Sequence, residues 1–235
     1  MASALKIALE DLLRTRRLQA DAPPLRGEDR RLRPFPTGVA AIDDLLQGGF
    51  PRGRVSEIHG AASSGRTGLA LALVARVTSG GALAAWIDPG DRLDPSSTAT
   101  AGVDLARFLW LRGERVGARL LADATAAAAT VVGSGLFEVV VVDLAAASGH
   151  DLRRLPSTTW IRLQRMVEET PSALLLLADA HVAQGPGGVS LALQSSGPRW
   201  SGMPGPGRFL RSLGASASAG RHGARSAALE LLAGD

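Results

Sequence analysis

Short apolar runs alternate with amphipathic segments through the middle of the chain. Runs rich in Val, Ile, Leu and Ala are typical of strands buried on both faces, and apolar residues three or four apart are typical of helices. This pattern predicts strands at 55–59, 83–87, 108–111, 137–142 and 174–178, and helices at 67–78, 94–101, 115–132 and 157–169. Such alternation predicts an α/β fold, a mostly parallel sheet with helices on both faces.

The amino-terminal segment has a different pattern. Residues 3–18 carry apolar side chains at helical spacing, and Ala22-Pro23-Pro24 ends the expected helix and begins a charged, proline-rich linker. We expect residues 1–34 to form a helical arm for oligomerisation or partner binding, and residues 35–235 to form the core domain. The expected partner-binding residues form the apolar stripe of the helix: Leu5, Ala8, Leu12 and Leu13.

After Ala180 the chain is rich in Gly, Ser, Pro and Arg. Two strands, 189–194 and 227–232, are predicted there, and they would extend the sheet at one edge. Five arginines lie between Asp179 and Glu230, where no acidic residue occurs: Arg199, Arg208, Arg211, Arg221 and Arg225. They are candidates for sequence-independent DNA binding through phosphates. The alternative is a flexible, solvated loop between two edge strands.

The amino-acid composition excludes several classes of function. The net charge of +4 is modest for a nucleic-acid binder. With no cysteine, disulfide and thiolate chemistry are excluded, and the four histidines (His59, His150, His181 and His222) show no metal-ligand spacing, so no metal site is expected. No uncharged apolar run approaches about 18 residues, and charged residues interrupt the amino terminus, so we expect a cytoplasmic protein without membrane association.

The strongest chemical motif directly follows the first predicted core strand. Gly60-Ala61-Ala62-Ser63-Ser64-Gly65-Arg66-Thr67 has the phosphate-loop spacing G-x-x-x-x-G-K-[ST], with arginine in place of lysine. Glycines let backbone N–H groups converge on a phosphate at a helix amino terminus, and the Thr67 hydroxyl suits magnesium. A guanidinium is wider than an ammonium, so Arg66 binds phosphate from a shifted pose or turns outward. The candidate nucleotide-binding residues are Gly60, Ser63, Ser64, Gly65, Arg66, Thr67 and Asp143.

Acidic residues follow two other predicted strands. Asp143 ends the apolar run 137–142 and is the candidate magnesium-site acid, or else a capping residue. Asp88 and Asp91 follow the second core strand, where a carboxylate would orient water for hydrolysis, or else they are turn residues.

Together these segments resemble bacterial RecA over roughly residues 1–180. The segments that carry the resemblance are Gly27-Glu28-Asp29-Arg30, Phe35-Pro36-Thr37-Gly38, Ile42-Asp43, Gly49 through Gly60, Ser63-Ser64-Gly65, Ile87-Asp88, Leu93-Asp94-Pro95, Gly102-Val103-Asp104 and the Asp143 strand. The resemblance implies a RecA-like fold, and an arm helix that packs on the neighbouring molecule.

The departures from RecA concern ATP turnover and DNA binding. Arg66 replaces the phosphate-binding lysine and Gly90 replaces the water-orienting glutamate. The first DNA-binding loop is shortened to residues 145–156, the second corresponds to 179–185, and RecA's carboxy-terminal domain has no counterpart. A short RecA relative with these losses resembles the ImuA (SulA-like) family of damage-induced mutagenesis proteins.

That resemblance implies a non-hydrolysing accessory factor of translesion synthesis in the SOS response. It would act through RecA, an ImuB-type polymerase partner or its own copies as a homo-oligomer. No catalytic residue is expected, and ATP with magnesium would bind weakly if at all. The alternative function is an active RecA-type, DNA-dependent ATPase in recombination or its regulation. Gly90 discriminates between the two, because a positioned carboxylate typically contributes about 10²–10⁴-fold to such a rate.

Overall fold

The computed structural model describes Asp11 and residues 33–113, 120–183, 187–203, 205–220 and 225–232. The arm expected at residues 1–34 lies outside these residues, apart from Asp11 and its last two positions. The expected partner-binding stripe and one candidate DNA-binding arginine are therefore not described: Leu5, Ala8, Leu12, Leu13 and Arg221.

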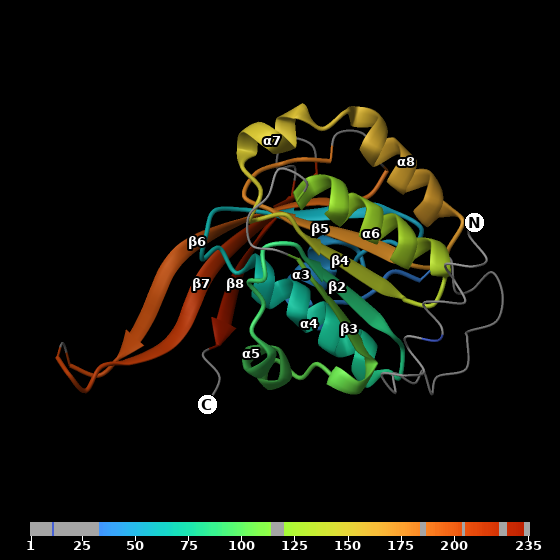
Figure 1. The fold of residues 1–235 in the computed structure, drawn as a ribbon. Helices are drawn as coiled ribbons and strands as arrows, with labels where there is room; N and C mark the ends of the chain where they lie inside the picture. The colour runs from blue at the N-terminus through green and yellow to red at the C-terminus, as the bar shows by residue number, and fades with distance from the viewer. Residues whose placement is uncertain are drawn as a thin grey trace.

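Within the described residues, eight strands form one sheet in the order β3-β2-β4-β5-β1-β6-β7-β8 (Figure 1). The strands are β1 (Val55–His59), β2 (Ala84–Asp88), β3 (Phe108–Arg112), β4 (Val139–Asp143), β5 (Ala173–Ala178), β6 (Ser190–Ser201), β7 (Phe209–Ala219) and β8 (Arg225–Leu232). Neighbouring strands from β3 to β6 pair in parallel, and β7 is antiparallel to both β6 and β8. The predicted mostly parallel α/β sheet is confirmed.

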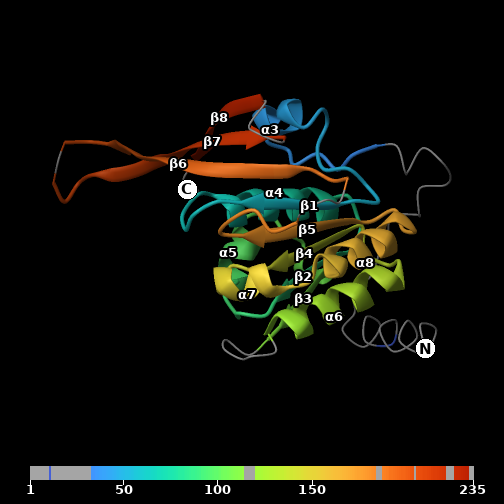
Figure 2. The same ribbon diagram turned by 90° about the horizontal axis from the view of Figure 1, so that it is seen from above.

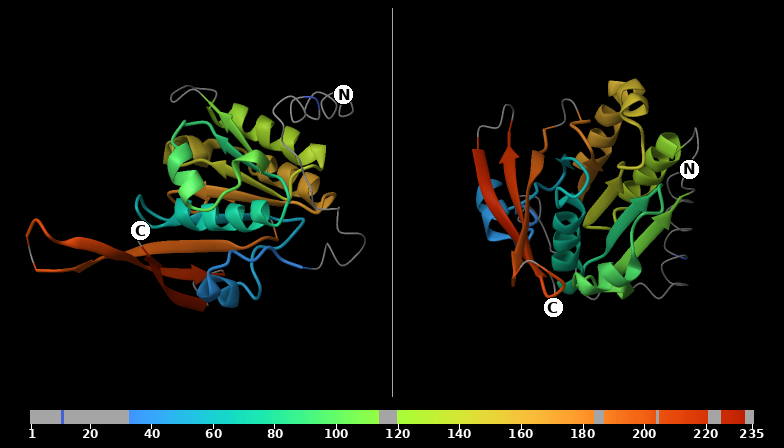
Figure 3. Two further views of the ribbon diagram at one scale, coloured as in Figure 1. Left: turned by 90° about the horizontal axis from the view of Figure 1, so that it is seen from below. Right: turned by 90° about the vertical axis from the view of Figure 1, so that its left-hand side faces the viewer.

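Helices cover both faces of the parallel part of the sheet (Figures 1 and 3). The described helices are α3 (Ala40–Leu45), α4 (Arg66–Ser79), α5 (Pro95–Thr100), α6 (Leu120–Ser134), α7 (Gly149–Arg154) and α8 (Ser157–Glu168), with a 3₁₀ turn at Leu105–Arg107. One face carries α4, and the other carries α6 and α8. The four helices predicted in the middle of the chain are confirmed, although residues 115–119 lie outside the described part.

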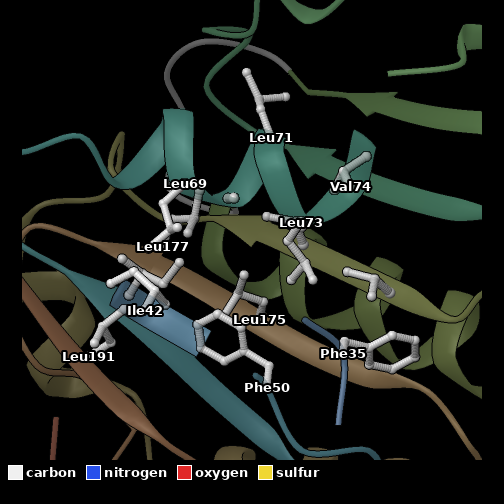
Figure 4. Packing of buried hydrophobic residues seen from close by; sticks show 14 of the residues in the cluster. Phe35, Ile42, Phe50, Leu69, Leu71, Leu73, Val74, Leu175, Leu177 and Leu191 are labelled. Atoms are coloured by element: carbon white, nitrogen blue, oxygen red, sulfur yellow. The ribbon is translucent and has the colours of Figure 1, made fainter. Parts of the chain in front are cut away.

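The sheet has a core on each face because its central strands carry apolar side chains on both faces. On β5, Leu175 and Leu177 pack in the layer under α4, while Leu174 and Leu176 pack in the layer under α6 and α8. Figure 4 shows the first layer, with Leu69 and other side chains of α4 facing the sheet. Such two-sided burial explains why these strands are continuous hydrophobic runs.

The alanine-rich part of α6 packs closely against the sheet, as its composition predicts. Ala124 and Ala128 are fully buried in the layer that contains Val140 and Val142 of β4. Small side chains let the helix approach the strands without leaving space between them.

The carboxy-terminal region differs from the prediction. The two strands expected there correspond to β6 and β8 and do extend the sheet at one edge, but β6 continues to Ser201 and a further long strand, β7, lies between them. The loop alternative is therefore wrong for most of this region. Beyond Gln194 the β6–β7 hairpin projects past the rest of the molecule (Figure 2), and most of its residues are exposed. Without a buried face it has no apolar alternation, which is why the pattern missed it.

Two short helices were also missed. Residues 145–156, expected as a shortened loop, contain α7, whose Ser148 hydroxyl accepts a hydrogen bond from the Asp151 amide at 3.1 Å. Helix α3 precedes β1 and packs beside β8. Six residues are too few to establish a hydrophobic period. Among the described residues, no helix is both long and apolar enough to cross a bilayer.

Candidate functional site

The candidate nucleotide site lies at the carboxyl ends of four adjacent strands. In the order β2-β4-β5-β1, these strands end at Asp88, Asp143, Ala178 and His59. Because the strands are parallel, their carboxyl ends share one edge of the sheet, where ligands bind in open α/β sheets. The phosphate loop leaves β1 at this edge and leads into α4.

The backbone of the loop is tightly packed. A side chain on Gly60 would place its Cβ 2.2 Å from the Leu193 carbonyl oxygen of β6 and 2.7 Å from the Ser64 hydroxyl. Ser63 and Gly65 have φ angles of 62° and 92°, in the left-handed region, and Gly65 is the N-cap residue of α4. The loop therefore keeps the compact backbone that phosphate binding needs, with the first turn of a helix behind it.

Arg66 lies within this edge and is only 7% exposed. One guanidinium nitrogen, Nη1, donates to the carbonyl oxygen of Gly60 and, at 3.2 Å, to that of Ala178. The other, Nη2, lies 2.6 Å from Asp179 Oδ1. The positive charge of Arg66, which would otherwise be available to a phosphate, is thus bound by groups at and after the ends of β1 and β5.

The other loop candidates surround Arg66. Thr67 is exposed in the first turn of α4, and Ser64 is buried with its hydroxyl unpartnered among the described atoms. The structure brings Gly60, Ser63, Ser64, Gly65, Arg66 and Thr67 together at one edge with Asp143; their role in nucleotide binding stays a prediction.

Asp143 is nearly buried at the end of β4. Its Oδ1 accepts a hydrogen bond from the Ala145 amide at 2.9 Å. Burial raises the pKa of Asp143, and the neighbouring Asp88 raises it further, while the Ala145 amide, Arg66 and Arg92 lower it. A carboxylate that its surroundings disfavour in charged form would gain from a bound cation.

Asp88 and Asp91 have structural partners. The Asp88 Oδ2 accepts hydrogen bonds from the amides of Arg92 and Leu93, both at 2.8 Å, so it anchors the turn after β2. The two carboxylate oxygens of Asp91 pair with Arg112 Nε and Nη2 at 2.6 and 2.8 Å. Both therefore match the turn-residue alternative, since the Asp91 amide also donates a hydrogen bond to the Asp88 carbonyl oxygen at 3.2 Å.

Gly90, between them, has no room for a side chain. A Cβ at this position would lie 2.4 Å from the Cβ of Ala146, in the segment after β4. Real Cβ atoms do not approach so closely, so the backbone here accommodates glycine and excludes a glutamate.

The sequence analysis missed one cluster of chemically active residues. Glu57 and His59 share a face of β1, and His181, in the segment after β5, brings its ring against Glu57 Oε1. Burial lowers the pKa of His59, which favours the neutral ring. Burial alone would raise the pKa of Glu57, but hydrogen bonds from Ser190, Ala183, His181 and Val182 lower it. The only signal in the sequence was Glu57 and His59 two positions apart on a predicted strand.

The four described candidate DNA-binding arginines lie in two separate regions. Arg199, Arg208 and Arg211 lie on the projecting β6–β7 hairpin, where Arg208 covers the Trp200 ring at 5.1 Å from its centroid. Arg225 begins β8 and pairs with Ala219, eight residues from Arg211 along β7. At about 3.3 Å per residue this is about 26 Å away. Arg225 instead lines a cavity of about 330 Å³ beside Glu57 and His181.

Known proteins match this chain over most of the segments that resemble RecA. The RecA N-terminal domain family matches residues 24–151. RecA from Picosynechococcus sp. is 38% identical over 114 residues, which are 48% of this chain and 31% of that protein. RecA from Lactobacillus delbrueckii subsp. bulgaricus is 39% identical over 120 residues, 51% of this chain and 35% of that protein. The matches thus span about a third of the length of these relatives.

A solved recombinase shares the fold. The crystal structure of the RadB recombinase superposes with a TM-score of 0.59 at 18% sequence identity, covering 83% of this chain and 95% of that one. The RecA family match takes in the phosphate loop and the strands that end in Asp88 and Asp143. Since it also covers more than half of the chain, this protein belongs to the RecA N-terminal domain family.

Proposed function

We propose that this protein is a non-hydrolysing, RecA-like accessory factor of DNA-damage-induced mutagenesis, of the ImuA type. It acts through contacts with RecA, an ImuB-type polymerase partner or its own copies. The observation that carries the proposal is the position of Arg66, whose guanidinium bonds to Gly60, Ala178 and Asp179.

The engagement of Arg66 argues against tight nucleotide binding. A phosphate approaching the loop must compete with Asp179 for the guanidinium and with two carbonyl oxygens that hold it in place. Lysine carries its charge on a compact ammonium that can reach an outer phosphate, whereas the planar guanidinium here spans the ends of two strands. The loop thus retains a backbone suited to phosphate, but its cation is held away from the position of an outer phosphate.

ATP with magnesium fits this edge only in part. The Gly60–Thr67 backbone, the Thr67 hydroxyl and the nearly buried Asp143 are groups that would hold phosphate and magnesium. Arg66 does not fit the same ligand without leaving its present partners. We therefore expect weak binding at most.

Hydrolysis would lack the water-orienting carboxylate that Gly90 replaces. Gly90 excludes a side chain because of Ala146, and Asp91 is paired with Arg112 through both carboxylate oxygens. Loss of a general base or water-orienting group typically costs about 10²–10⁴-fold in rate. A chain that keeps the fold and loses this group is suited to binding roles.

The amino-terminal arm is the proposed partner-binding element. An amphipathic helix of about sixteen residues is marginal by itself in water, so its apolar stripe needs a surface to cover it. A charged, proline-rich linker favours extension away from its own core. Docking on the core of a neighbouring RecA-like molecule is a heterologous contact, which builds rings or filaments or lets this protein join those of RecA.

A capture experiment tests the partners. Tagged full-length protein, recovered from cells after DNA damage, should bring down RecA or a mutagenesis polymerase. Deleting residues 1–20, or changing Leu12 and Leu13 to Asp, should abolish the capture and lower the mass seen by light scattering. Leu105→Asp, at an exposed position of the core, is the matched control. Capture of neither protein class, or capture unaffected by the arm variants, would contradict the proposal.

DNA contact is a second part of the proposal. Arg199, Arg208 and Arg211 share one projecting hairpin with Trp200, which is 45% exposed. Arginines neutralise phosphates without reading sequence, and an exposed indole offers a stacking surface to single-stranded bases. Any DNA binding should therefore be sequence-independent and sensitive to salt.

A further inference from the structure

Glu57 and His59 of one strand lie beside His181, which is more than 120 positions later in the sequence. Glu57 and His59 lie on β1, and His181 lies in the segment that follows β5, 124 residues from Glu57. Their ligand atoms all lie within 4.8 Å of one another. We propose that these three side chains form a binding site for a transition-metal dication of the Zn²⁺ class.

The carboxylate of Glu57 is held in the orientation that a ligand needs. Its Oε2 accepts hydrogen bonds from the amides of Val182 and Ala183 at 3.0 and 2.9 Å. Its Oε1 is left facing the two imidazoles, and it also accepts from the Ser190 hydroxyl at 2.5 Å. Hydrogen bonds from a second layer of residues orient metal ligands in this way.

The two histidines complete a three-ligand arrangement. His59 Nε2 lies 4.0 Å from Glu57 Oε1, and His181 Nδ1 is already in contact with that oxygen. Bonds of about 2.0–2.1 Å to a tetrahedral Zn²⁺ place ligand atoms about 3.4 Å apart, so His181 Nδ1 must move back from Glu57 Oε1 and His59 Nε2 must come slightly closer to it. His181 can make its adjustment because its side chain is 47% exposed.

The two imidazole nitrogens and one carboxylate oxygen indicate which metal ions the site would bind. Imidazole nitrogen with one carboxylate suits Zn²⁺ and its transition-metal neighbours, whereas Mg²⁺ and Ca²⁺ prefer sites made of oxygen atoms. Three protein ligands leave a fourth position for water. Glu57, His181 and Ser190 line the cavity of about 330 Å³, so that position opens onto a space that admits a hydrated ion.

A metal here would fix the segment that holds Arg66. Asp179, the ion-pair partner of Arg66, lies two residues before His181. Coordination through His181 ties this segment to β1, directly before the phosphate loop. The metal would therefore support the present arrangement of the phosphate loop, in which Arg66 pairs with Asp179.

The test uses full-length protein without a polyhistidine tag, stripped with EDTA and titrated with ZnCl₂ by calorimetry. We expect one equivalent of Zn²⁺ to bind and to raise the melting temperature, since a ligand of the native state stabilises it. His59→Gln and His181→Gln should each weaken binding by at least about tenfold. His150→Gln is the matched control, because His150 is an exposed residue of α7 beside Asp151. MgCl₂ in place of ZnCl₂ should give no comparable heat.

Spectroscopy separates a built site from surface binding. Co²⁺ in place of Zn²⁺ should give visible absorption of a four- or five-coordinate ion, which both histidine variants lose and His150→Gln keeps. Circular dichroism establishes that each variant is folded. Absence of Zn²⁺ binding, binding that survives both variants, or equal loss in His150→Gln would overturn the proposal and leave the Glu57–His181 contact as a hydrogen bond that only supports the loop.

Discussion

Arg66 and Asp179 form an ion pair, 2.6 Å from Nη2 to Oδ1, that links the phosphate loop to the end of β5. The arginine is nearly buried and the aspartate is largely exposed, so the pair lies at the mouth of the candidate nucleotide site. The Arg66 guanidinium in this position binds acceptors of the protein itself and no bound anion is needed to neutralise it. In the proposed function, this ion pair is the reason that we expect the loop to bind nucleotide weakly.

Replacing Arg66 with lysine should restore nucleotide binding without hydrolysis. Lysine cannot bridge Gly60, Ala178 and Asp179 as the guanidinium does, and its ammonium suits an outer phosphate. Calorimetric titration with ATP and magnesium should show affinity for Arg66→Lys that exceeds the wild-type value by at least tenfold. Arg76→Lys, at an exposed position of the same helix, is the control. Tight wild-type binding that Arg66→Ala removes would contradict this interpretation.

Gly90→Ala should destabilise the protein because its Cβ meets that of Ala146 at 2.4 Å. Overpacking of this kind costs roughly 1–3 kcal/mol. For a chain of this size each kcal/mol lowers the melting temperature by about 2–4 °C. Ala146→Gly in the same chain should recover most of the loss, as measured by thermal denaturation.

The control for this prediction is Gly133→Ala. Gly133 lies in α6, and a Cβ there would be 3.7 Å from Met166 Cε of α8, an ordinary contact, so this variant should be neutral or slightly stabilising. Equal losses at both glycines, or no recovery by Ala146→Gly, would show that the contact with Ala146 does not exclude a side chain.

Asp143→Asn should stabilise the protein near neutral pH. Burial raises the pKa of Asp143 above its usual 3.8, so folding disfavours the charged carboxylate. Below pH 3.8 the group is protonated in both states and the substitution gains nothing. The gain should grow as the pH rises through the raised pKa and then stay constant.

Glu57→Gln should have the opposite effect. The pKa of Glu57 lies below 4.5, so its charged form stabilises the native state above pH 4.5 and that contribution is lost as pH falls through the lowered value. Melting temperatures of both variants between pH 3 and pH 8 provide the comparison. Parallel curves for the two variants would contradict the assigned environments.

Combined replacement of Arg199, Arg208 and Arg211 by Gln should weaken single-stranded DNA binding uniformly across sequences. Each phosphate contact contributes about 0.7 to the slope of log K against log salt, so the slope should fall by about 2. Arg225→Gln should change the slope little, because Arg225 begins the edge strand β8 beside the cavity, away from the projecting hairpin. Band-shift titrations at several salt concentrations measure both. Binding that ignores salt, or survives the triple change, would rule out the hairpin as the DNA contact.

The sequence predicted the strands that are buried on both faces, and it missed the exposed strand β7 and the two short helices α3 and α7. Strands such as β5 are continuous apolar runs because each face meets a helix layer, and this signal is strong. The β6–β7 hairpin has most of its side chains in solvent beyond Gln194, so no period marks it. Short helices such as α7 depend on a single cap, here Ser148.

The candidate site was predictable as a list of residues but not as a set of contacts. The replacement of lysine by Arg66 is visible in the sequence, whereas its bonds to Ala178 and Asp179 depend on β5 lying beside β1. The Glu57–His181 contact joins residues 124 positions apart, so no local spacing could indicate it. Likewise, the loss of a glutamate at Gly90 was visible, and its packing against Ala146 was not.

The central claim is the absence of ATP turnover, and a phosphate-release assay tests it most directly. Full-length protein is incubated with ATP and magnesium, with and without single-stranded DNA, beside Arg66→Ala prepared in the same way. We predict that the wild type releases no more phosphate than Arg66→Ala under either condition, because Gly90 supplies no carboxylate to orient water and Arg66 is held by Gly60, Ala178 and Asp179. DNA-stimulated release by the wild type, at least tenfold above Arg66→Ala, would contradict the account and favour an active ATPase.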